Sequence, residues 1–204
     1  MLIHQADVAR LAGLETAIPL ILPHAASSAA LADLRSEMPF ATAIADAEAA
    51  AALPEGVSQL PLPVDLVEAS VPADPRISVD SPWVYLFTGG STGNPRIWTK
   101  TPANLLAESD YLVKRFAVTP EDRILATAPP NHIYSLLYAV LVPLLSGARV
   151  STATPVFPHE ILTALRDSGA TILVSLPVHY RSLRAHSIDD HVLRLAFSSA
   201  GPLD

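Results

Sequence analysis

The 204-residue sequence contains no cysteine and only two lysines, and both shortages limit what the protein can do. Without cysteine the chain has no disulfide, no thiolate metal site and no thiol nucleophile. The two lysines, Lys100 and Lys114, belong to a chain with a formal net charge of −7. Binding to nucleic acid needs clustered basic side chains, so we expect no nucleic-acid partner and only local binding of any anionic ligand.

Long apolar runs and several common site motifs are also missing. The longest run, residues 133–148, is shorter than the roughly 20 residues of a transmembrane helix, so we interpret it as a buried helix and expect no membrane span. No signal peptide is evident at the N-terminus, which makes the cytoplasm the expected compartment. The sequence contains no G-x-S-x-G elbow, no Walker loop and no G-x-G-x-x-G fingerprint.

The charged and histidine residues outside these motifs give no clear site. His179, His186 and His191 have no acidic residues at ligand spacing, so we predict no metal site. Glu121 and Asp122 are interpreted as solvated loop charges.

Half of the residues are apolar, and the mean hydropathy is +0.35. A chain of this length and composition can bury a substantial core, which excludes disorder of the whole. The hydropathy is high for a soluble monomer. We therefore expect part of the apolar surface to be covered by the rest of a longer protein or by a second copy in a homodimer.

Apolar runs alternate with amphipathic stretches along the chain. Strands are predicted at residues 16–22, 41–45, 59–64, 84–87, 123–128, 148–152, 171–175 and 193–197. Helices are predicted at residues 25–36, 102–118, 134–145, 158–167 and 178–186, while residues 47–53 favour either a solvated helix or a linker. This alternation predicts an α/β fold with a mainly parallel sheet covered by helices on both faces. A proline-rich connection at residues 54–75 closes an N-terminal subdomain (1–75) before a second subdomain (76–204).

The most informative stretch, residues 88–96, follows the predicted strand 84–87. Its glycines let backbone N–H groups turn inward, Ser91 and Thr92 add hydroxyls, and Arg96 adds a positive charge. A turn of this composition between a strand and a helix start is typical of an anion site. We interpret it as a phosphate-binding loop, with an ordinary glycine-rich turn as the alternative.

Two further stretches also follow predicted strands. The first, P-P-N-H-I-Y-S-L at residues 129–136, contains His132, whose ring can donate or accept a hydrogen bond without adding a fixed charge. A helix-start histidine bonded to the backbone is the alternative. The second, S-S-A-G-P-L at residues 198–203, is typical, when taken alone, of an ordinary junction between a strand and a turn. Because ligands of parallel sheets bind beyond the strand carboxyl ends, we expect all three stretches to meet in one crevice at one sheet.

These stretches resemble three motifs of the adenylate-forming superfamily, which includes acyl- and aryl-CoA synthetases, luciferases and the adenylation domains of peptide synthetases. The family pattern T-S-G-[ST]-T-G-x-P-K reads T-G-G-S-T-G-N-P-R here, so Gly89 replaces serine and Arg96 replaces lysine. The run H-I-Y-S-L is similar to a form found in aryl-CoA ligases. S-S-A-G-P-L is similar to S-G-[AG]-[AE]-P-L, with Ser199 replacing glycine. The similarity runs from about residue 14 to residue 204.

The resemblance implies that the protein activates a carboxylic acid with Mg-ATP and passes the acyl group to CoA or to the thiol of an acyl carrier protein. It implies catalytic roles for Thr92, Arg96 and His132, and an acyl pocket lined by His132 and Tyr134. Whether the acid is aryl or alkyl stays open. The residues implied to bind the nucleotide come from the first and third stretches: Thr88, Gly89, Gly90, Ser91, Thr92, Gly93, Asn94, Pro95, Arg96, Ser199, Ala200, Gly201 and Pro202.

Later elements of the family have no counterpart here, among them the adenine- and magnesium-binding segment, the ribose-binding aspartate and the catalytic lysine of a C-terminal domain. We therefore expect the chain to be the N-terminal part of a larger enzyme that does not complete the reaction alone, with the magnesium ligand in the missing part. Two alternatives stay open. One is a nucleotide- or acyl-binding module without turnover, and the other is an interaction protein that uses only the fold.

Overall fold

The computed structural model describes residues 19–23, 27–45, 47–60, 78–88, 96–129, 132–187, 192–199 and 201–202. The chain divides into two compact units, a first unit of Gln5–Thr101 and a second unit of Met1–His4 with Pro102–Asp204. This division lies after Thr101, later than the boundary expected after residue 75. The predicted phosphate loop is therefore grouped with the N-terminal part of the chain.

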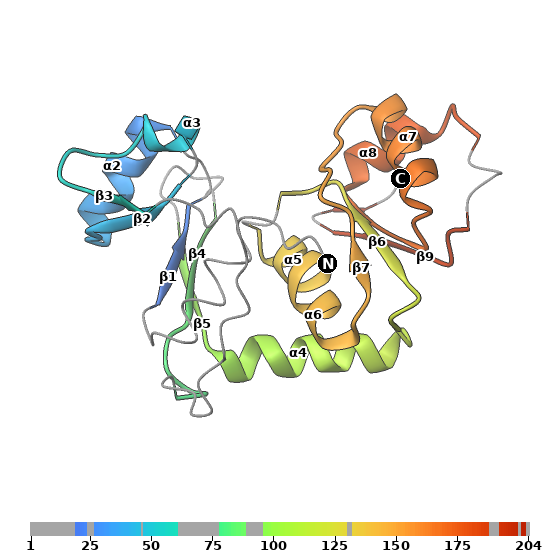
Figure 1. Cartoon of the computed structure of the whole chain (residues 1–204), viewed down its shortest axis with the longest axis horizontal. Coiled ribbons are helices and arrows are strands. Elements are labelled where there is room, and N and C mark those ends of the chain that lie inside the picture. Colours follow the sequence, from blue (N-terminus) through green and yellow to red (C-terminus); the bar gives the residue numbers. More distant parts are fainter. Residues whose placement is uncertain are drawn as a thin grey trace. The chain divides into compact units, whose positions relative to one another are not determined.

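The first unit contains two small sheets, one of order β1-β4-β5 and one of order β2-β3 (Figure 1). Within them β1 runs parallel to β4 and β2 runs parallel to β3, whereas β4 and β5 are antiparallel. Its elements are β1 (Leu20–Leu22), α2 (Ser28–Glu37), β2 (Thr42–Ile44), α3 (Ala47–Ala50), β3 (Ser58–Leu60), β4 (Val84–Thr88) and β5 (Arg96–Lys100).

Helix α2 confirms the amphipathic helix predicted at residues 25–36. Its inner face buries Leu31 and Leu34, which pack against Ile21 of β1 and Tyr85 of β4. The Ser27 hydroxyl caps the helix by accepting a hydrogen bond from the Ala30 N–H at 3.3 Å, as expected of serine before a helix start. Burial of two leucines thus fixes α2 on the β1-β4-β5 sheet.

The second unit is built on a four-stranded sheet of order β7-β6-β8-β9, in which every neighbouring pair is parallel. Its elements are α4 (Pro102–Arg115), β6 (Arg123–Ala126), α5 (Ile133–Leu136), the π-helical turn η1 (Leu137–Leu141), α6 (Val142–Ser146), β7 (Arg149–Val150), α7 (Pro158–Ser168), β8 (Ile172–Ser175), α8 (Pro177–Leu183) and β9 (Leu195–Ser198).

Helices cover both faces of this sheet (Figure 1). On one face Ala126, Val174 and Phe197 pack with residues of α4, η1 and α6. On the other face Leu125 and Leu173 pack with residues of α7 and α8. This confirms the mainly parallel α/β fold. The expectation of one sheet is wrong for the described residues, whose strands form three separate sheets.

The helix predicted at residues 134–145 is irregular just before Pro143. It starts as α5, widens into the π-helical turn η1 and continues as α6. Pro143 has no N–H and its ring crowds the carbonyl four residues earlier, and a wider turn relieves that crowding. The helix ends at Gly147, whose φ of +76° is left-handed and whose N–H bonds the Pro143 carbonyl at 2.9 Å.

Asp122 is not a solvated loop charge, and this expectation is corrected. The residue is 4% exposed. Its carboxylate accepts hydrogen bonds from Arg194 Nε at 2.7 Å and Nη2 at 2.5 Å, and from the Thr171 hydroxyl at 2.7 Å. The Arg194 hydrogen bonds are the main reason that the pKa of Asp122 lies well below its usual range. The pair joins the segment before β6 to the segment before β9.

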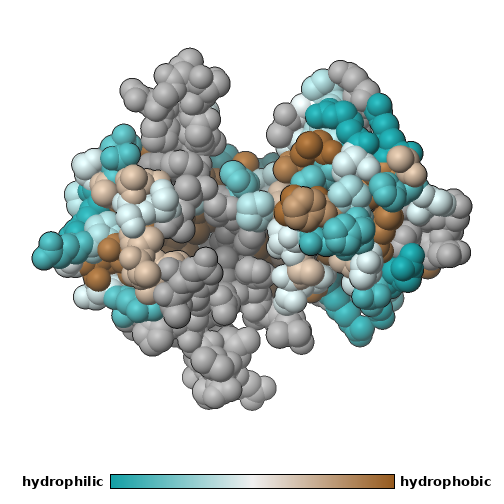
Figure 2. All heavy atoms as spheres, turned by 90° about the horizontal axis from the view of Figure 1, so that it is seen from above, coloured by the Kyte–Doolittle hydropathy of each residue, from teal (hydrophilic) through white to brown (hydrophobic). Residues whose placement is uncertain are grey.

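Large apolar side chains also reach the surface, where Figure 2 shows brown atoms between teal polar ones. Among the exposed residues of the second unit are Leu145, Val156, Phe157 and Val178. Within the described residues, no helix combines the length and apolar character that crossing a membrane requires.

Candidate functional site

The first candidate stretch lies between two antiparallel strands. Residues 89–95 are outside the described residues, so their role as a phosphate loop stays a prediction. The backbone on either side is defined, since β4 ends at Thr88, β5 begins at Arg96, and these two residues pair. The glycine-rich run therefore connects a hairpin, whereas the composition favoured a turn leading directly into a helix. No strand is predicted from the sequence at residues 96–100, because the exposed Ile97, Trp98 and Thr99 give no alternation of buried and exposed positions.

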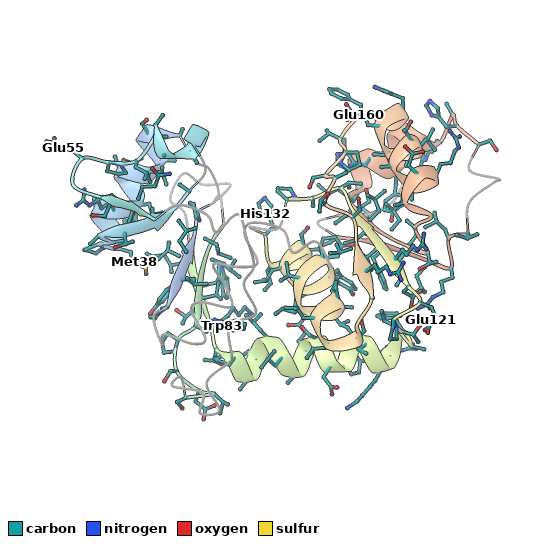
Figure 3. All side chains as sticks on the ribbon, viewed as in Figure 1. Met38, Glu55, Trp83, Glu121, His132 and Glu160 are labelled. Carbon is teal, nitrogen blue, oxygen red and sulfur yellow. The ribbon has the colours of Figure 1, made fainter. Side chains whose placement is uncertain are left out.

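The second stretch leaves the carboxyl end of β6. Thr127 and Ala128 are buried, Pro129 is exposed, and Pro130 and Asn131 are outside the described residues. His132 is exposed at the N-cap of α5, and its side chain makes no capping hydrogen bond. The ring is thus not bonded to the helix start, contrary to the alternative of a capping histidine. Figure 3 shows His132 at the start of α5, at the opposite end of β6 from Glu121.

Tyr134, the predicted acyl-pocket residue, starts a row of aromatic rings. The centroid of its ring lies 5.2 Å from that of Tyr138. The centroid of the Phe197 ring lies 4.6 Å from that of Tyr138 and 4.7 Å from that of Phe116. Burial raises the pKa of Tyr134, and its buried hydroxyl makes no hydrogen bond of normal geometry. The row thus runs from Tyr134, two positions after His132, through Phe197 of β9 to Phe116.

The third stretch leaves the carboxyl end of β9. Of the predicted residues Ser199, Gly201 and Pro202 are described, and Ala200 is outside the described residues. A Cβ added to Gly201 would lie 3.9 Å from Pro177 Cγ, and the Pro202 carbonyl accepts a hydrogen bond from Arg181 at 3.4 Å. The turn after β9 therefore lies beside the start of α8.

The sheet brings two of the three stretches to one edge. Strands β6 and β9 both pair in parallel with β8, so the turns containing His132 and Gly201 leave the sheet at the same carboxyl edge. The phosphate stretch follows a strand of a different sheet in the first unit. Convergence of the second and third stretches at one sheet edge is confirmed, and a common sheet for all three is not found.

Three polar residues near this edge were not predicted as part of the site. Thr127, Ser175 and His179, which we call the strand-end cluster, are 2%, 0% and 8% exposed. The Thr127 hydroxyl oxygen lies 2.6 Å from Ser175 Oγ and 2.7 Å from His179 Nδ1. The only signal in the sequence is a hydroxyl residue at the end of two apolar strands, which is too common to identify a cluster.

Comparison with known proteins adds the family. The profile of the family described as "AMP-binding enzyme" matches residues 10–204. The chain belongs to this family. An acyl-CoA ligase (SID4) of Ajellomyces capsulatus is 30% identical over 122 residues, covering 57% of this chain and 21% of that protein. A feruloyl-CoA synthase of an Amycolatopsis species is 28% identical over 163 residues, covering 77% of this chain and 33% of that protein.

Solved structures of AMP-binding enzymes share the fold. A malonyl-CoA ligase in a ternary product complex with methylmalonyl-CoA and AMP superimposes with a TM-score of 0.80 at 23% identity, covering 98% of this chain and 45% of that one. At this identity the likeness shows the fold alone, which is that of the N-terminal part of adenylate-forming enzymes. The chain spans a fifth to a third of the length of the two curated relatives just named.

Proposed function

We propose that the complete protein is an AMP-forming acid–thiol ligase, which activates a carboxylic acid with ATP and then acylates CoA or a carrier-protein thiol. The proposal rests on one observation in a chain of the AMP-binding family. The turns containing His132 and Gly201 follow β6 and β9, which both pair with β8, so the two turns lie at the same edge of one parallel sheet. This edge is where α/β proteins bind nucleotides. The supply of ATP and of carrier thiols fits the expected cytoplasmic location.

The first half-reaction joins the acid to AMP. A carboxylate oxygen attacks the α-phosphorus, the bond from that phosphorus to the bridging oxygen breaks, and pyrophosphate leaves. The protein contributes by positioning the two reactants and neutralising charge on the transferring group. We assign the binding of the β- and γ-phosphates to Ser91, Thr92 and Arg96, and the border of the adenine to residues 199–202.

His132 is assigned to the acid. Its exposed ring makes no capping bond with α5, so a ring N–H is available to donate to the substrate carboxylate. Tyr134, two residues later and half-buried, is assigned to the wall of the acyl pocket. In the second half-reaction the thiolate attacks the acyl carbon and AMP leaves as the mixed anhydride breaks.

Magnesium would enter the site with ATP and neutralise phosphate charge. Among the described residues no three histidine, cysteine or acidic side chains lie close enough together to hold a metal ion. We therefore assign no residue of this chain to magnesium and propose that its ligands lie in the later segments of the family.

Pyrophosphate release from the complete protein tests the proposal. Purified protein would be incubated with Mg-ATP and single acids from a panel of hydroxycinnamic, benzoic, alkyl and malonic acids. The aryl and dicarboxylic members are chosen because of the feruloyl-CoA synthase and malonyl-CoA ligase similarities. Acid-dependent release that falls at least about tenfold in Arg96→Ala, the loss expected when a charged phosphate contact is removed, would support the proposal. Arg166→Ala, which removes an exposed arginine of α7, is the charge-matched control.

The outcomes separate the alternatives. ATP binding without release by any acid would favour a binding module without turnover. Undetectable ATP binding by the wild-type protein would favour an interaction protein. Equal activity of the wild-type protein and Arg96→Ala would contradict the assignment of residues 88–96 to phosphate binding.

A further inference from the structure

The strand-end cluster lies at the carboxyl ends of β6 and β8, next to the turns that contain His132 and Gly201. Ala126 pairs with Val174, and Ser175 pairs with Ser198, so Thr127, Ser175 and Ser198 occupy one row across the ends of β6, β8 and β9. Neighbouring strands are about 4.8 Å apart, which lets adjacent hydroxyls on one face interact. Since Ala126, Val174 and Phe197 face α4 and η1, this hydroxyl row faces α8 on the other side.

The three side chains of the cluster bond one another through the Thr127 hydroxyl. The Thr127 hydroxyl carries one hydrogen, so it donates to either Ser175 Oγ or His179 Nδ1 and accepts from the other. Either order is compatible with a neutral ring, and burial lowers the pKa of His179 and so favours that form. The titratable side chain next to it on α8 is Tyr180. No carboxylate or cation bonds the His179 ring within the described parts of the chain.

Helix α8 contacts the segments at the ends of β6 and β9 through different residues. His179 bonds Thr127, which follows β6. The Tyr180 hydroxyl donates to the Phe197 carbonyl of β9 at 2.8 Å. Arg181 donates to the Pro202 carbonyl in the turn beyond β9, and Pro177 lies against Gly201. One short helix therefore touches both the turn that leads to His132 and the turn that contains Gly201.

We propose that the strand-end cluster is a positioning device, in which His179 of α8 holds Thr127 and so fixes the turn before His132 relative to the turn after β9. The proposal rests on the proposed function, because it assigns both turns to one nucleotide-binding site. Thr127 lies five positions before His132, and no other side-chain hydrogen bond is found along the described residues of that segment, 127–129 and 132. Loss of the Thr127 hydroxyl should let this turn move while the apolar core under it stays packed.

Two measurements on the complete protein test this. In the first, the affinity for Mg-ATP is measured by calorimetry for the wild type, Thr127→Val, Thr127→Ser and Ser109→Ala. Thr127→Val keeps the side-chain shape and removes the hydroxyl, and we expect it to weaken binding at least about fivefold, the ratio that one neutral hydrogen bond provides. Thr127→Ser should restore the wild-type affinity.

Ser109→Ala is the matched control. The Ser109 hydroxyl is also fully buried in the second unit and also makes a short hydrogen bond, at 2.7 Å to the Leu105 carbonyl, but within α4. Its removal should lower stability by a comparable amount and leave the affinity for Mg-ATP unchanged. This separates positioning of the turns from general loss of stability.

The second measurement is hydrogen–deuterium exchange without nucleotide, in peptides that cover residues 127–134 and 198–202. Thr127→Val should speed exchange in both peptides, and Ser109→Ala in neither. Should Thr127→Val fail to fold, Ser175→Ala, which removes a different hydroxyl of the same cluster, takes its place in both measurements.

The two measurements together decide whether the cluster positions the two turns. Faster exchange in both peptides together with weaker binding supports the proposal. If the wild type binds Mg-ATP and Thr127→Val behaves like Ser109→Ala in either measurement, the proposal is overturned. If the wild type binds no Mg-ATP, the proposed function fails, and exchange alone decides whether the cluster holds the two turns.

Discussion

Removing the charge of Asp122 should destabilise the second unit, because the carboxylate is buried among hydrogen-bond donors. The carboxylate accepts hydrogen bonds from Arg194, from the Thr171 hydroxyl and, at 2.9 Å, from the Thr119 N–H. Arg194 donates to both carboxylate oxygens, through Nε to Oδ1 and through Nη2 to Oδ2. In Asp122→Asn the new amide N–H₂ group would therefore face an Arg194 N–H in either orientation, so that donor loses its acceptor and the Arg194 charge loses its partner.

The expected size follows from the burial of the two partners. Breaking a buried ion pair by removing one partner costs about 3–5 kcal/mol. The side chain of Arg194 is 38% exposed while that of Asp122 is 5% exposed, so solvent can compensate part of the loss. We therefore expect about 3 kcal/mol, which for a protein of this size lowers the melting temperature by about 6–12 °C.

Thermal unfolding followed by far-UV circular dichroism at pH 7 measures this effect. Glu121→Gln is the control, since Glu121 is the neighbouring carboxylate, is exposed and is expected to lower the melting temperature much less. The pH dependence gives a second readout. Because Arg194 lowers the pKa of Asp122 in the folded state, the stabilisation is complete above the unfolded-state pKa of about 4 and is lost as the pH falls below it. If Asp122→Asn lowers the melting temperature no more than Glu121→Gln does, the Asp122–Arg194 pair does not stabilise the second unit as described.

Four further substitutions probe other parts of the second unit. Burial lowers the pKa of His179, so the stability that its neutral form provides should be complete above about pH 6.5 and decline as the pH falls below that value. Between pH 7.5 and pH 5 the urea midpoint of His179→Gln should therefore decline less than that of the wild type. Gly147→Ala should lower the free energy of unfolding in urea by about 1–2 kcal/mol, because φ is +76° and the new Cβ would lie 3.3 Å from Pro120 Cγ. Gly201→Ala should leave it unchanged, because the new Cβ would lie 3.9 Å from its nearest neighbour, Pro177 Cγ. Ser198→Ala should leave the urea midpoint unchanged or raise it slightly, because the buried Ser198 hydroxyl has no partner to lose; a clear decrease would show that it has one.

The elements that the sequence predicts best are those whose pattern is local. The apolar runs that become β6 and β8 are buried on both faces, so they carry continuous hydrophobic residues and are found from composition alone. The end of α7 is found equally well, because Gly169 takes a left-handed φ of +58° directly after the last helical residue. In contrast, β5 pairs only with β4 among the described strands and exposes Trp98, so its residues give no burial pattern.

The contacts that the sequence does not predict join residues far apart in the chain. Asp122 and Arg194 are 72 residues apart, and Thr127 and His179 are 52 apart. The neighbouring residues indicate a strand, a helix or a loop for each of them, but not the distant side chain that it bonds. Their partners are set by strand order and register. Strand β8 must lie beside β6 before Thr127 can bond His179, and between β6 and β9 before Asp122 can bond Arg194.

The most direct test of a nucleotide site at this sheet edge is photolabelling of the complete protein with 8-azido-ATP, followed by peptide mapping. We expect label in the peptide that contains Ser199, Gly201 and Pro202, with protection by excess ATP and reduced labelling in Arg96→Ala. Label confined to peptides outside residues 129–136 and 198–203, or labelling that excess ATP does not reduce, would contradict a nucleotide site at this sheet edge.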